Sequence, residues 1–143
     1  MRTMLLSVTV LVVPMLAIAC APVVPACDMP EIEITSFGNF LSGTACGVDL
    51  NTTRVVVYIE VTNEYGTSWW LKPYWSEPLT KIGWLGTWSC NIQTGGTDWS
   101  AQKACAYLVP DNYNPASEEN AGHPGRGSIA SDCATRGVQL PPW

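Results

Sequence analysis

The amino-acid sequence predicts an all-β protein, built from short antiparallel strands as a sandwich or a barrel. Hydrophobic residues recur with a period of two along several short segments, which is typical of strands with a buried face. Turn-forming residues separate these segments at nearly even spacing. The chain has 143 residues, 13% of them charged, with seven Trp, 11 Pro and 12 Gly, a composition that suits one packed domain and disfavours a helix bundle.

Residues 1–19 have the pattern of an export signal peptide. Arg2 is the only charge, an apolar stretch follows it, and Ala17-Ile18-Ala19 supplies small residues for cleavage. The stretch is shorter than the about 20 apolar residues that a comfortable membrane span requires. We therefore expect the protein to be exported.

Cys20 follows this segment and can be interpreted in two ways. The residues before it resemble a bacterial lipobox, in which Cys20 becomes the lipid-modified N-terminus and tethers the domain to a membrane without spanning it. The alternative is ordinary cleavage nearby, with Cys20 discarded or paired. Residues 20–30 are rich in Pro and predict a tether.

The first three strands are predicted over residues 31–34, 54–61 and 67–75. Glu and Ile alternate cleanly in the first segment. The second is the strongest, with two faces: Val55, Val57, Ile59 and Val61 on one, and Val56, Tyr58 and Glu60 on the other. The third ends at Pro73 or shortly after, since proline cannot donate a ladder hydrogen bond.

Three further strands are predicted over residues 87–93, 102–109 and 128–135. The first of these directs Trp88, Cys90 and Ile92 inward. The second is apolar, although its alanines leave a short helix over residues 101–107 as an alternative. The third is short.

Turn signals divide these strands, and they lie at residues 42–43, 49–52, 63–66, 85–86, 95–96 and 111–115. Residues 111–127 predict a long surface loop because Asn, Pro and Gly are frequent there. We expect a sandwich domain over residues 31–115 and a loop-rich extension over residues 116–143 that contributes at most one strand.

Six cysteines are compatible with disulfides in an exported protein. If Cys20 is lipidated or removed, five remain, and one is then a free thiol or joins two molecules. If residues 91–94 and 101–104 were the arms of a hairpin, Cys90 and Cys105 would lie nearly opposite each other and could be bridged. The other candidates for a second bridge are Cys27, Cys46 and Cys133.

Tryptophan is concentrated in one part of the chain, with six of the seven between residues 69 and 99. On a strand, Trp69, Leu71 and Trp75 share one face and predict core positions. Trp70, Lys72 and Tyr74 share the other face, which predicts a partly exposed aromatic surface with a single cation.

Exposed aromatic rings suit sugar binding, because the C–H faces of sugar rings stack on them and neighbouring polar groups take the hydroxyls. The predicted ligand-binding residues are Trp70, Tyr74 and Trp99 as stacking rings, with Lys72 and Asp98 to orient hydroxyls and Asn91 and Gln93 as further polar candidates. The alternative is that the aromatic residues only fill a small core and shield its edges.

Catalytic, metal-binding and nucleic-acid-binding patterns are missing. The single His, His123, lies in a turn sequence without a nucleophile pattern, and no phosphate-binding loop occurs, so we expect no enzyme activity. No Cys-x-x-Cys pair is present, so we predict neither a metal nor a cofactor. The isoelectric point near 4.6 and the absence of a basic run argue against nucleic acid as a partner.

Several motifs occur in an order that resembles a small immunoglobulin-like β-sandwich module of secreted bacterial proteins, often found beside carbohydrate-active enzyme domains. They are Gly43-Thr44, residues 54–60, residues 69–73, residues 86–92, residues 94–98 and residues 108–115. The resemblance implies an immunoglobulin-like antiparallel sandwich and an accessory, non-catalytic role. This chain departs from it by the extra Cys46, Cys105 and Cys133 and by having no accompanying enzyme domain.

Together these features predict an exported, non-catalytic binding domain at the cell envelope. Polysaccharide is the expected ligand, and a membrane is contacted only through an N-terminal lipid. The alternative is a structural or protein-interaction domain of the cell surface that is linked to its partner by a disulfide.

Overall fold

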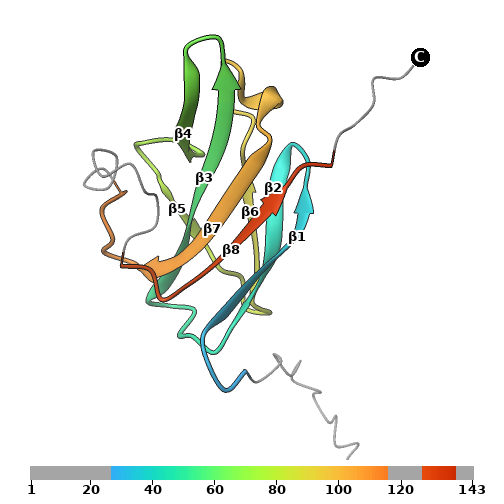
Figure 1. The fold of residues 1–143 in the computed structure, drawn as a ribbon. Coiled ribbons are helices and arrows are strands. Elements are labelled where there is room, and N and C mark those ends of the chain that lie inside the picture. The colour runs from blue at the N-terminus through green and yellow to red at the C-terminus, as the bar shows by residue number, and fades with distance from the viewer. Residues whose placement is uncertain (1–26, 116–126, 138–143) are drawn as a thin grey trace, which may run out of the picture.

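The protein folds as an antiparallel β-sandwich, as a computed structural model of the chain shows (Figure 1). The structure describes residues 27–115 and 127–137. Its elements are β1 (Glu31–Phe37), β2 (Phe40–Cys46), β3 (Thr53–Asn63), β4 (Gly66–Lys72), β5 (Leu79–Lys81), β6 (Thr87–Asn91), the 3₁₀-helix η1 (Asp98–Ser100), β7 (Lys103–Pro110) and β8 (Ala130–Thr135). In this part of the chain no helix is long and apolar enough to cross a membrane. The predicted signal segment, Cys20 and His123 lie outside the described residues.

Two sheets form the sandwich. The smaller has the order β1-β2-β6, and the larger has the order β4-β3-β7-β8, with β5 also paired to β3. At one side of the sandwich β1 lies against β8, where the Ile34 backbone N–H donates to the Asp132 carboxylate over 2.7 Å. At the other side β4 and β6 are the edge strands of their sheets.

The all-β prediction is confirmed, and the predicted strands correspond to β1, β3, β4, β6, β7 and β8. The strand predicted over residues 102–109 forms as β7 (Lys103–Pro110), and the alternative helix over residues 101–107 does not, because the alanines of β7 lie between β3 and β8 in the larger sheet. β5 and β2 were not predicted. β8 pairs along β7, so the larger sheet includes residues beyond position 115.

The prediction of a turn at Ser42-Gly43 is wrong, since both residues lie in the middle of β2. Gly43 is paired with Ile34 on one side and Trp88 on the other. A Cβ atom on Gly43 would overlap the Glu33 carbonyl oxygen and lie 2.7 Å from Cζ2 of Trp88. Glycine is therefore required here for close packing and not for a turn.

β3 has buried residues on both faces. Val55, Val57, Ile59 and Val61 face the smaller sheet and join the main core with residues such as Leu41 and Ile92. Val56 and Tyr58 belong to a second cluster on the outer face of the larger sheet, which also contains Leu71, Cys105, Tyr107 and Val109. In a strand that is covered on both faces every side chain is buried, which explains why the apolar residues of β3 form a continuous run.

The described residues contain two disulfides, and neither is the Cys90–Cys105 bridge that the sequence suggested. Cys105 is bonded to Cys133, its direct partner across β7 and β8, and Cys27 is bonded to Cys46. Cys90 is unpaired and buried. The expected hairpin does not form, because β6 and β7 belong to different sheets.

Candidate functional site

The connection from β6 to β7 contains a turn, Thr94-Gly95-Gly96-Thr97, that is held by hydrogen bonds to the Asp98 carboxylate. The Oδ2 atom of Asp98 accepts hydrogen bonds from the backbone N–H groups of Thr94 at 2.9 Å and Gly95 at 3.0 Å. It also accepts a hydrogen bond from the Lys72 ammonium over 2.5 Å. One buried carboxylate therefore fixes both the turn and its attachment to β4.

Lys72 is not the exposed cation that the sequence predicted. It lies opposite Val57, on the face of β4 that points toward the other sheet, and only 6% of the residue is exposed. Its Nζ atom donates to Asp98 and, over 3.0 Å, to the hydroxyl of Thr94. The side chains of Lys72 and Asp98 are paired with each other and hold the turn against β4, while both residues also line the hollow beside Trp70.

Trp70 and Trp99 stand on either side of this turn. Trp70 is 51% exposed and lines, with Lys72 and residues 94–98, a shallow hollow of about 270 Å³. Trp99 is 68% exposed and lines a hollow of about 230 Å³ with Gln93 and the turn. Both hollows include Gly95, Gly96 and Asp98, so each indole stands beside a hollow that the same turn borders.

The two glycines leave this surface open. Gly96 has a φ of +57° and Gly95 a φ of +150°, and a Cβ atom on either residue would meet nothing within 4 Å. The backbone N–H groups of Gly96 and Thr97 have no hydrogen-bond partner within residues 27–115 and 127–137. The turn therefore exposes backbone and free N–H donors at the border of both hollows.

Arg136 fixes the position of Trp99 and was not recognised in the sequence. Its guanidinium donates to the Trp99 carbonyl over 2.6 Å and to the Gly38 carbonyl over 3.0 Å, and it lies 4.7 Å from the centre of the Phe37 ring. It thus ties η1 to the turn between β1 and β2. A single Arg in a polar segment carries no sequence pattern from which these contacts can be inferred.

The other predicted aromatic positions have different surroundings. Tyr74 is 53% exposed but lines neither hollow. Trp75, predicted to be core, is also exposed, because β4 ends at Lys72 and the alternation does not continue past Pro73. Trp69, also predicted to be core, is only partly buried and packs against the cluster on the outer face of the larger sheet. Trp88 is buried, as predicted.

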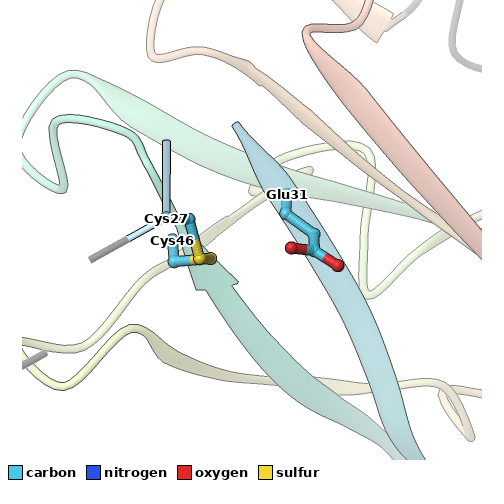
Figure 2. A group of neighbouring side chains, drawn as sticks. All are labelled: Cys27, Glu31 and Cys46. Atoms are coloured by element: carbon cyan, nitrogen blue, oxygen red, sulfur yellow. A yellow bond between two sulfur atoms is a disulfide. The ribbon is translucent and has the colours of Figure 1, made fainter. Parts of the chain in front are cut away.

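Cys27, Cys46 and Glu31 form a second group of potential ligand atoms at the start of β1 (Figure 2). Both sulfur atoms belong to the Cys27–Cys46 disulfide and so are not thiolates. Only the Glu31 carboxylate then remains as a strong ligand, which is too few for a metal centre.

Cys90 is a buried thiol between the two sheets. Burial raises its pKa to about 11, and a hydrogen bond with Thr80 and the charge of Lys72 offset only part of this effect. The thiol is therefore protonated at neutral pH and inaccessible, so it does not have the features of a reactive cysteine.

Known proteins do not suggest a function for this chain, so the function is proposed from the geometry of the site. No protein-family model matches this chain, and no curated protein and no solved structure is significantly similar to it.

Proposed function

We propose that this protein is an exported, non-catalytic domain of the cell envelope that binds polysaccharide through Trp70 and Trp99. The observation that carries this proposal is the pair of exposed indoles on either side of the open Gly95-Gly96 turn. Large aromatic rings at a surface favour a ligand that removes them from water, and sugar rings present flat C–H faces to stack on them.

The polar groups beside the rings support the same ligand class. Gln93, Thr97 and the N–H groups of the turn lie along the two hollows and suit the hydroxyls of a sugar. We propose that these groups orient the hydroxyls of the sugar. The sequence had suggested this role for Lys72 and Asp98, whose side chains form an ion pair with each other. Tyr74 lies outside both hollows and is not included in the proposed site.

We further propose that the sandwich is an immunoglobulin-like accessory module. In immunoglobulin folds strands A, B, E and D form one sheet and C, F and G the other, and variable-type domains add C′ to the second sheet. The sheet orders support this assignment with β1, β2 and β6 as strands A, B and E, with β3, β7 and β8 as C, F and G, and with β4 as C′. Among the described residues no strand takes the place of D beside β6. The disulfide that usually joins the two sheets of this fold is absent among the described residues, where the disulfides are Cys27–Cys46 and Cys105–Cys133.

Export is part of the proposal and is supported by the two disulfides, since such bonds persist mainly in oxidising compartments. The alternative of a disulfide-linked surface assembly has less support. The only unpaired cysteine of the described residues is Cys90, which is buried and has no access to a partner molecule.

The test is retention of the chain from Ala21 onward on a panel of insoluble polysaccharides. This chain keeps Cys27 and therefore the bridge to Cys46. We expect Trp70→Ala and Trp99→Ala each to weaken retention about tenfold, since one stacked ring contributes about 1.5 kcal/mol.

Trp84→Ala is the matched control for this test. Trp84 is 68% exposed, as Trp99 is, but lies at the other end of the sandwich. Circular dichroism verifies that each variant is folded. Equal retention of all three variants and the wild type, or no retention on any glycan, would contradict the proposal.

A further inference from the structure

A second group of exposed apolar side chains lies at the end of the sandwich opposite the Trp99 site. Met29, Trp84 and Leu85 are 76%, 68% and 41% exposed, and we call them the entry-end patch. Residue 92 lies beside Asn39 and residue 86 lies beside Ala45, so β6 runs from the entry end to the other end. Three apolar residues this exposed at one end are unusual unless something covers them.

The patch surrounds the place where the chain enters the fold. The Gly86 carbonyl accepts a hydrogen bond from the Ala45 N–H over 2.7 Å, which holds Trp84 and Leu85 beside the end of β2. Leu85 lines a hollow of about 250 Å³ together with Cys27 and Cys46. Met29 lies against Gly47, one residue beyond Cys46. Figure 1 shows the start of β1, and Figure 2 shows the Cys27–Cys46 disulfide beside it.

We propose that the entry-end patch rests on a lipid bilayer surface when the chain is anchored at Cys20. This contact rests on the lipid anchor that the lipobox-like residues before Cys20 predict, and it is additional to the proposed function and separate from the glycan site. Residues 21–26 are the only ones between Cys20 and the bonded Cys27. Fully extended, they and the flanking bonds span about 20–25 Å, so the patch stays close to the membrane.

The chemistry of the patch suits the membrane interface. Trp is enriched there because its ring is apolar and its N–H is polar, and Leu and Met add apolar area. One lipid chain gives only marginal membrane binding, so a second contact from the protein has a measurable effect. The Cys27–Cys46 disulfide fixes the end of the tether to the end of β2, beside the patch.

The charges beside the patch select the type of bilayer. Asp28, Glu31 and Glu33 are exposed there, and their carboxylates are repelled by anionic headgroups. We therefore expect the patch to rest on a surface of net-neutral headgroups. In this orientation the Trp99 hollow points away from the membrane.

The experiment uses the chain from Cys20 onward, coupled through Cys20 to a maleimide lipid in phosphatidylcholine vesicles. The two disulfides and the burial of Cys90 leave Cys20 for the coupling. Brominated acyl chains in the vesicles quench Trp fluorescence at the membrane. We expect quenching in the wild type and in Trp99→Phe, and a loss of most of it in Trp84→Phe.

Quenching that is unchanged in Trp84→Phe, or that is lost in Trp99→Phe, would overturn the proposal. Replacement of a third of the phosphatidylcholine by phosphatidylglycerol is expected to reduce the quenching, and an increase would refute the assigned headgroup. Glycan retention of Trp84→Phe is measured in parallel. Because anchoring is supplied chemically and the glycan is absent from the vesicles, failure here is distinct from failure of the glycan site.

Discussion

The Asp98 carboxylate has several donors around one oxygen atom: the Lys72 ammonium, the Thr94 hydroxyl and the N–H groups of Thr94 and Gly95. A buried charge is tolerated only when it is paired and hydrogen-bonded. At the scale of single residues, this arrangement explains how a surface turn with two glycines is held in one conformation.

Removal of Asp98 is expected to destabilise the protein more than removal of Lys72. Asp98→Ala leaves the Lys72 ammonium buried without a counter-charge, and we expect the free energy of unfolding to fall by about 3–5 kcal/mol. Lys72→Met is expected to cost less, because Asp98 keeps its two backbone donors. Urea denaturation measures both changes, and a smaller loss for Asp98→Ala than for Lys72→Met would contradict this assignment.

The buried Cys90 thiol predicts a pH dependence of stability. Burial raises its pKa from 9.0 to about 11, so the unfolded chain releases this proton at lower pH than the folded protein. Below about pH 9 the thiol is protonated in both states, so the free energy of unfolding keeps its full value there. As the pH rises from about 9 to 11, the free energy of unfolding falls by at most about 1.4 kcal/mol per pH unit.

Comparison of Cys90→Ala with the wild type isolates this contribution. At pH 8 we expect Cys90→Ala to have a lower free energy of unfolding than the wild type, because the substitution leaves a cavity. Between pH 9 and 11 we expect its free energy of unfolding to decrease less than that of the wild type. Tyr107, whose pKa is also raised by burial, contributes in both proteins. Equal slopes in the two proteins would show that the thiol is accessible to water.

At the scale of the elements, β2 depends on a residue that ordinarily weakens strands. Gly43 lets β1 and β6 approach β2 closely, with the Trp88 ring over its Cα. Gly43→Ala is expected to lower the free energy of unfolding by at least about 3 kcal/mol, because rigid backbone surrounds the missing Cβ.

Gly38→Ala is the matched substitution for this test. Gly38 lies in the turn between β1 and β2, and the nearest atom to a Cβ there is 4.0 Å away. We expect its stability to stay within about 1 kcal/mol of the wild type, measured by thermal or urea unfolding. If both variants are equally stable, the packing requirement at Gly43 is wrong.

At the scale of the whole molecule, the two disulfides close loops between residues far apart in the sequence. The bonded cysteines are separated by 19 residues in Cys27–Cys46 and by 28 residues in Cys105–Cys133. Loops of this length correspond to about 3–4 kcal/mol each in the chain-entropy treatment. The first fixes the start of β1 to the end of β2, and the second joins β8 to the larger sheet.

Mass spectrometry of peptides from unreduced protein tests this pairing. We expect peptides linked through Cys27–Cys46 and Cys105–Cys133, with Cys90 alkylated only after unfolding. The double replacement Cys105→Ala with Cys133→Ala is expected to lower the free energy of unfolding by about 3–4 kcal/mol. A linked peptide that contains Cys90 would contradict the sheet assignment of β6 and β7.

The sequence alone determined the all-β class and the main strands, because the period-two pattern of β1 and β6 follows from one buried face and needs no distant contact. The apolar run of β3, which is buried on both faces, is also visible in the sequence. The sequence also predicted that Trp70 is exposed, but the position of this ring beside the Gly95-Gly96 turn comes only from the tertiary structure. Local patterns failed for β2, where glycine is explained only by the neighbouring strands.

Tertiary structure alone decided which cysteines are bonded and what Lys72 contacts. Both depend on which strands become neighbours, and β6 and β7 are adjacent in sequence but lie in different sheets. The Lys72 side chain meets Asp98, 26 residues later, only because the turn folds over the edge of β4. Pairings of this kind are set by the burial of the whole core and not by any local preference.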